Sequence, residues 1–150
     1  TFPELLAADR MVIGVVDDGY WLDLGTPLAF AKGSADLVRG IAPSPLLTSR
    51  TGEALIEPTA KVDSSASITG GTYIGHNAVV GASAVINGSV IFAEVEVGSG
   101  TQITNSIVST AAKISSDCII IDTVIAERAQ INTGATLEPG TLVFPDETVN

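Results

Sequence analysis

Few side chains in this sequence could do chemistry. The 150 residues include one histidine, His76, and one cysteine, Cys118. A lone histidine could serve as the general base of a group-transfer reaction, but it cannot supply the three protein ligands of a catalytic zinc site. Cys118 falls in a small-residue position of a repeat and has no histidine near it in the sequence. We therefore interpret Cys118 as a core residue rather than a nucleophile.

A third candidate lies in the stretch "DDGYWLDLGTP", residues 17–27. It contains the only tryptophan of the chain, Trp21, and the only acidic residue flanked by two leucines, Asp23. Taken alone, Asp23 could equally be a surface acid of a hairpin or a capping residue near a helix start. The residue types leave a structural role and a ligand role open.

The charge composition of the chain limits which classes of binding partner are expected. The chain has 17 acidic residues against 7 basic ones, a net charge of −10, which argues against nucleic acid or an anionic membrane. Mean hydropathy is high, at +0.41. The longest apolar run, "IVSTAAKISSDCIII", is interrupted by Lys113 and Asp117, so no membrane-spanning helix is expected. A single cysteine suits a reducing cytoplasm. The chain starts at a threonine inside what reads as a structural unit, and we expect it to be a fragment.

The elements that would position these residues follow from a repeat. From Ile56 to Val149, 17 positions spaced five or six residues apart are all Ile, Val or Leu. The fourth residue after most of them is small, with Ile107 and Glu147 as misfits. Neither a helix nor an alternating strand gives this spacing. A coil with three short sides does, each side turning one large and one small residue inward. This hexapeptide pattern predicts a parallel β-helix of about five coils over residues 56–150.

Residues 1–55 do not repeat. "MVIGVV" and "YWLDL" flank the turn "DDG", which predicts a hairpin over residues 11–24. Thr26 and Pro27 predict the start of a helix that Gly40 ends. We expect residues 1–41 to be a remnant of another domain, because a unit this short cannot form a core of its own. Residues 42–55 are rich in Pro and Ser and are expected to form a linker.

The whole chain resembles a known family. "FPELL", "GYWLDLGTPLAFAKGSADLVRG" and hexapeptide repeats of the style "TNSIV" are similar to the end of sugar-1-phosphate nucleotidyltransferases, in particular the bacterial mannose-1-phosphate guanylyltransferases. The resemblance implies a left-handed β-helix and an α/β remnant before it. It also implies a parent enzyme that joins a sugar 1-phosphate to a nucleoside triphosphate, expected to be GTP, and releases pyrophosphate.

The resemblance assigns one site residue in this sequence. Asp23 corresponds to an aspartate that holds Mg²⁺ between the phosphates, a role that suits a carboxylate because Mg²⁺ prefers oxygen ligands. The Gly-rich nucleotide loop of the family is not in this sequence. We therefore expect no catalytic residue in the fragment and no activity from it alone. The β-helix is expected to serve homo-oligomerisation or regulation. The alternative is a hexapeptide acyltransferase that uses His76 as its general base.

Overall fold

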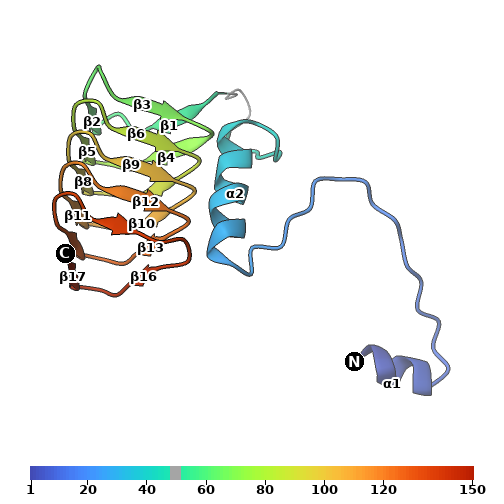
Figure 1. The fold of residues 1–150 in the computed structure, drawn as a ribbon. Helices are drawn as coiled ribbons and strands as arrows, with labels where there is room; N and C mark the ends of the chain where they lie inside the picture. The colour runs from blue at the N-terminus through green and yellow to red at the C-terminus, as the bar shows by residue number, and fades with distance from the viewer. Residues whose placement is uncertain (48–51) are drawn as a thin grey trace.

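The computed structural model describes residues 1–47 and 52–150 (Figure 1). Seventeen short strands, three to a coil, make five complete coils and two strands of a sixth. The predicted left-handed parallel β-helix is therefore confirmed, with slightly more coils than the repeat suggested. Strand β1 begins at Ala54, inside the stretch 42–55 that was expected to be linker. The rest of that linker includes residues 48–51, which lie outside the described residues.

Each strand pairs in parallel with the third strand after it, which is one coil further along the chain, and the pairing gives three flat sheets. Sheet A consists of β1 (Ala54–Ile56), β4 (Thr72–Ile74), β7 (Val90–Ile91), β10 (Ile107–Val108), β13 (Val124–Ile125) and β16 (Leu142–Val143). Sheet B consists of β2 (Lys61–Val62), β5 (Val79–Val80), β8 (Glu96–Val97), β11 (Lys113–Ile114), β14 (Gln130–Ile131) and β17 (Thr148–Val149). Sheet C consists of β3 (Ser67–Thr69), β6 (Val85–Asn87), β9 (Gln102–Thr104), β12 (Ile119–Ile121) and β15 (Thr136–Leu137).

The large residues of the repeat form the core, as predicted. Thirteen of the 17 positions are buried: Ile74, Val80, Ile86, Ile91, Val97, Ile103, Val108, Ile114, Ile120, Ile125, Ile131, Leu137 and Val143. Val62, Ile68 and Val149 are partly buried against them. Ile56 is 42% exposed although it pairs in register with the buried Ile74, so its predicted burial is wrong. The four exceptions lie in the first and last coils, where only one neighbouring coil covers the core.

The corner between sheets C and A departs from the predicted pattern. Here the small inward residue comes three positions after the large one, and the buried residues are Ser89, Ser106 and Thr123. Ile107 lies one position after the buried Ser106, which is why it did not fit the predicted pattern of small residues. The N–H of Ser106 donates to Ser89 Oγ at 3.1 Å, and the N–H of Thr123 donates to Ser106 Oγ at 3.1 Å. This hydroxyl ladder satisfies backbone groups that the tight corner would otherwise bury unpaired.

The same corner sets the length of each coil. In the shorter coils a single residue with positive φ turns the chain there: Gly88, Asn105 or Asp122. In the longer coils the corner holds one residue more, at Gly70–Gly71 and at Pro139–Gly140. Gly70, Gly71 and Gly140 also have positive φ, a conformation that glycine adopts without steric cost. Coil length therefore varies at one corner while the strands stay in register.

Helix α2 (Pro27–Val38) lies beside the stack of coils (Figure 1). It begins as predicted, with Pro27 in its first turn and Thr26 Oγ1 accepting the N–H of Ala29 at 3.1 Å. The helix packs against β4. Its residues Ala31 and Val38 are buried.

The segment before α2 differs from the prediction. Helix α1 (Phe2–Ala7) forms, but all of its residues are exposed. Residues 8–26, all of them described, form no helix or strand, so the predicted hairpin over 11–24 is wrong. The turn chemistry is correct, because the N–H of Gly19 donates to Asp17 Oδ1 at 2.7 Å. The strands are missing because a two-stranded hairpin with no sheet to pack on buries too little apolar surface.

Candidate functional site

Asp23 lies in the extended segment just before α2. Its carboxylate is exposed, and its Oδ1 accepts the N–H of Gly25 at 3.0 Å. This local turn orients the carboxylate before the chain enters the helix. In the part of the chain that the structure describes, no three His, Cys, Asp or Glu side chains lie close enough together to hold a metal ion. Asp23 is thus one potential carboxylate ligand, and any further ligands would come from phosphates or from other residues.

The segment around Asp23 is held on α2 by alternate side chains. The hydroxyl of Tyr20 donates to Asp36 Oδ2 at 2.8 Å. Leu22 and Leu24 lie over Gly33, where an added Cβ would be 2.8 Å from Leu24 Cδ2. Trp21 is 82% exposed, in agreement with alternation in an extended chain. The sequence predicted neither these contacts nor the role of Gly33. The contacts join an irregular segment to a helix, and no local sequence pattern links the two.

Asp36 is a buried carboxylate, only 6% exposed. It forms an ion pair with Lys32, one turn earlier on α2. The hydrogen bond from Lys32 is the largest influence holding the pKa of Asp36 below its ordinary value, although burial acts in the opposite direction. The same bond raises the pKa of Lys32. Asp36 is therefore charged at neutral pH, and its ion pair with Lys32 offsets part of the cost of burying it.

A groove of about 870 Å³ runs between α2 and the corner of the β-helix that joins sheets C and A. Its polar lining includes Lys32, Asp36 and Arg39 from the helix side. Asn87 and Asn105 line it from the corners of the coils. Both cations are already paired with acids, Lys32 with Asp36 and Arg39 with Glu53 at 3.5 Å. This pairing makes the groove a poor site for an anion.

His76 lies on the corner between sheets A and B, away from that groove. Its side chain is exposed, with Nε2 at 3.6 Å from Glu57 Oε2 and Nδ1 at 3.4 Å from Thr59 Oγ1. The sequence prediction missed Glu57 as a partner. The length of the repeating coil could have found it, because it places residues 57–59 next to 75–77. A carboxylate beside the ring could orient an imidazole base.

Cys118 is fully buried, as predicted for a core residue. Its Sγ lies 3.4 Å from the carbonyl oxygen of Ser115 and 3.2 Å from that of Asn132, and the thiol can donate its one hydrogen to either. A buried thiol in an apolar coil is shielded from substrates, so the interpretation as a structural residue is retained.

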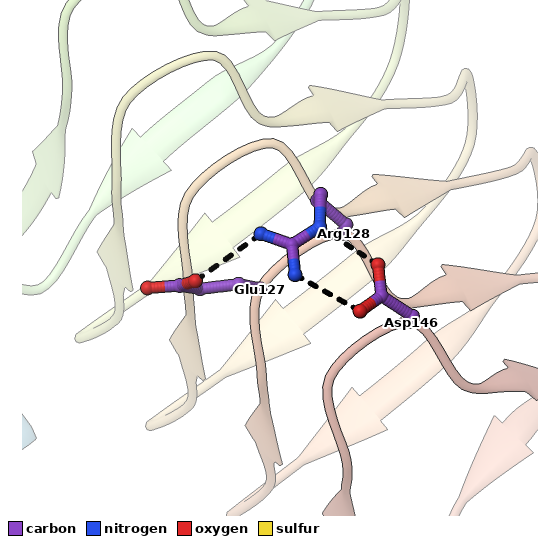
Figure 2. A network of polar contacts seen from close by, with 3 residues as sticks. All are labelled: Glu127, Arg128 and Asp146. Carbon is purple, nitrogen blue, oxygen red and sulfur yellow. Dashed lines mark hydrogen bonds and ion pairs between the residues drawn. The ribbon is translucent and has the colours of Figure 1, made fainter.

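A network of charged side chains joins two coils at the corner between sheets A and B (Figure 2). Arg128 donates to Asp146 through Nε at 2.7 Å and Nη2 at 2.9 Å, and through Nη1 to Glu127 at 3.3 Å. Its hydrogen bonds hold the pKa of Asp146 below the ordinary value. All three side chains are exposed. The bidentate geometry fits a structural clamp between adjacent coils rather than a binding site.

The sequence matches the GMPPB C-terminal domain family over residues 50–150. The chain belongs to this family. The mannose-1-phosphate guanylyltransferase of Mycobacterium tuberculosis is 49% identical over 92 residues, which cover 61% of this chain and 26% of that protein. The chain thus spans about a quarter of the length of this relative. The family match includes the β-helix and begins after the phrase that contains Asp23.

One solved structure agrees with the fold of this GMPPB C-terminal domain. A hexapeptide transferase family protein from Anaplasma phagocytophilum superposes with a TM-score of 0.52 at 18% identity, covering 63% of this chain and 72% of that one. A variant of GDP-perosamine N-acetyl transferase from Caulobacter crescentus, in complex with CoA and GDP-perosamine, reaches only 0.31 at 17% identity, over 62% of this chain and 49% of that one. The first likeness concerns the fold alone, and the second is too weak to bear on chemistry.

In residues 1–47 and 52–150, no helix is long and apolar enough to span a membrane.

Proposed function

We propose that this chain is the C-terminal part of a cytoplasmic mannose-1-phosphate guanylyltransferase, which makes GDP-mannose and pyrophosphate from mannose 1-phosphate and GTP. The observation that carries the proposal is the family membership of residues 50–150, together with the 49% identity to an enzyme of that name. The phrase "GYWLDLGTP" precedes the family match in the expected place. The exposed apolar residues Met11, Ile13 and Val16 support it, because they suit a segment that is covered in a larger catalytic domain.

Asp23 is the proposed Mg²⁺ ligand of the intact enzyme. One exposed carboxylate fits this role, because Mg²⁺ is usually held by one or two carboxylates together with substrate phosphates. The bound ion would neutralise charge on the phosphates. The N–H of Gly25 orients the carboxylate, and Trp21 on the same side of the segment would pack against the catalytic domain. Residues 1–150 alone lack a nucleotide loop and are expected to be inactive.

Pyrophosphate release from mannose 1-phosphate and GTP tests this role in the intact enzyme. Asp23→Asn should lower kcat by roughly 10²-fold or more, because the lost charge acts on the transition state. Asp17→Asn is the matched control, since Asp17 is also exposed and makes the same kind of turn with Gly19. Wild-type turnover by Asp23→Asn, or tight Mg²⁺ binding to residues 1–150 by calorimetry, would refute the metal role.

The β-helix is proposed to mediate homo-oligomerisation. The outward side chains of sheet C are uncharged: Ser67, Thr69, Val85, Asn87, Gln102, Thr104, Ile119, Ile121 and Thr136. A chain with a net charge of −10 can approach a second copy most easily through such a face. Sedimentation equilibrium should show self-association that Ile119→Lys weakens. A monomer at about 10 μM, a range for weak interfaces, would contradict this.

Acyl transfer with His76 as the general base is the second candidate. It is favoured only by the Glu57 carboxylate at 3.6 Å from the imidazole. An assay of acetyl transfer from acetyl-CoA to amino sugars tests it, with His76→Ala as the variant. Loss of an acetylation activity in this variant would favour acyl transfer over the guanylyltransferase proposal.

A further inference from the structure

Helix α2 makes two sets of contacts, one with the β-helix and one with the segment before it. On the side of the β-helix, Gly71 abuts Ala35 so closely that a Cβ on Gly71 would lie 2.6 Å from Ala35 O and 2.9 Å from Ala35 Cβ. Gly71 also has a φ of +80°, so a side chain is excluded by backbone conformation and by space. This contact fixes the C-terminal half of α2 against the first coils.

Helix α2 also holds the segment 20–24. The Tyr20 hydroxyl reaches Asp36, far along the sequence, at 2.8 Å. Leu22 and Leu24 occupy the space above Gly33. A local ion pair with Lys32 would already partner Asp36, and the Tyr20 hydroxyl could be hydrated by water. The long-range bond therefore serves the placement of the segment rather than the helix.

We propose that Asp36, through Tyr20, is a positioning residue for Asp23. The proposal rests on the function proposed above. Because side chains alternate in an extended chain, fixing residues 20, 22 and 24 on α2 directs Trp21 and Asp23 to the opposite side. The β-helix holds α2, α2 holds the segment, and the segment presents the metal ligand. The β-helix thereby contributes to catalytic geometry without touching the substrate.

The first experiment measures docking without activity. Trp21 is the only tryptophan, so its fluorescence anisotropy in residues 1–150 reports the nanosecond mobility of this segment. Tyr20→Phe removes a single hydroxyl and is expected to fold normally. It should lower the anisotropy, as should Asp36→Ala, while circular dichroism keeps its β-helix signal. Asp23→Asn is the matched control and should leave the anisotropy unchanged. Unchanged anisotropy in both Tyr20→Phe and Asp36→Ala would overturn the proposal.

The second experiment uses the intact enzyme. Tyr20→Phe and Asp36→Ala should each lower kcat by about 10-fold while KM for GTP stays the same, because a displaced metal ligand costs rate rather than nucleotide binding. Asp36→Asn should partly restore kcat, since its amide oxygen can still accept from Tyr20. In the Asp36→Ala background, Tyr20→Phe should add no further loss. Ser34→Ala, on α2 close to Asp36, is the control.

The outcomes separate this proposal from the parent function. If Asp23→Asn abolishes turnover but Asp36→Ala keeps wild-type kcat, the positioning role is overturned and the guanylyltransferase proposal stands. If Asp23→Asn has wild-type turnover, the metal role fails and the positioning role fails with it. A rise in KM for GTP without a fall in kcat would also overturn positioning, because it would indicate a role in nucleotide binding.

Discussion

The same residue types behave oppositely in two regions of this chain. In the β-helix, Ile and Val at the repeat positions are buried almost completely, whereas Met11, Ile13, Val15 and Val16 in the extended segment are exposed. The two regions differ in how far along the sequence each strand or segment finds the residues that cover it. In the β-helix each strand meets its partners at a fixed spacing, one coil away along the chain. The extended segment has no such repeat and needs partners from elsewhere. Burial here follows from periodic self-pairing rather than from hydrophobicity.

The largest expected effect on stability comes from a substitution in the buried core of the β-helix. Ile103 is fully buried in sheet C, between the inward residues Ile86 and Ile120 of the neighbouring coils. Ile103→Asp would bury a carboxyl group without a partner and should cost roughly 3–5 kcal/mol of unfolding free energy. Urea denaturation followed by circular dichroism measures it. Gln102→Asp, the outward neighbour, is the control and should change stability little. An unchanged denaturation midpoint for Ile103→Asp would show that this position is not in the core.

A smaller effect sharpens the comparison at the corner between sheets C and A. Ser106→Ala removes the acceptor of the Thr123 N–H and leaves this buried donor unpaired. The expected cost is about 1–3 kcal/mol. Ser99→Ala, at an exposed corner of the β-helix, is the control in the same urea titration. Equal midpoints for the two variants would mean that the hydroxyl ladder does not stabilise the coil.

The smallest effect concerns the exposed clamp of Arg128, Asp146 and Glu127 (Figure 2). Arg128→Ala should lower the melting temperature only slightly, because exposed ion pairs contribute little. The difference should shrink in about 1 M salt. Because Asp146 has a lowered pKa in the folded chain, the clamp should stabilise above the ordinary aspartate pKa of about 3.9. This contribution should be lost as the pH falls through the lowered value. A difference that persists in high salt would point to packing of the Arg128 side chain instead of charge.

The sequence was sufficient for the elements whose partners recur at a fixed spacing. The inward positions from Ile74 to Val143 and the start of α2 at Thr26 follow from local patterns, and the structure confirms them. The hairpin over 11–24 failed because strand formation depends on a sheet that no local pattern reveals. The contact of Tyr20 with Asp36 was missed for a related reason, since nothing in the types or spacing of these residues marks them as partners.

The corner that carries the hydroxyl ladder also governs how the length of this chain can change in evolution. A residue can be added or removed there, as at Gly70–Gly71 and Pro139–Gly140, while every later Ile and Val still faces inward. A deletion inside a strand would instead turn the remaining side chains of that strand over. Insertions and deletions among homologues should therefore occur mainly at the corners between sheets C and A. Equivalent positions in two coils are then found by aligning their corners, not by counting a constant number of residues.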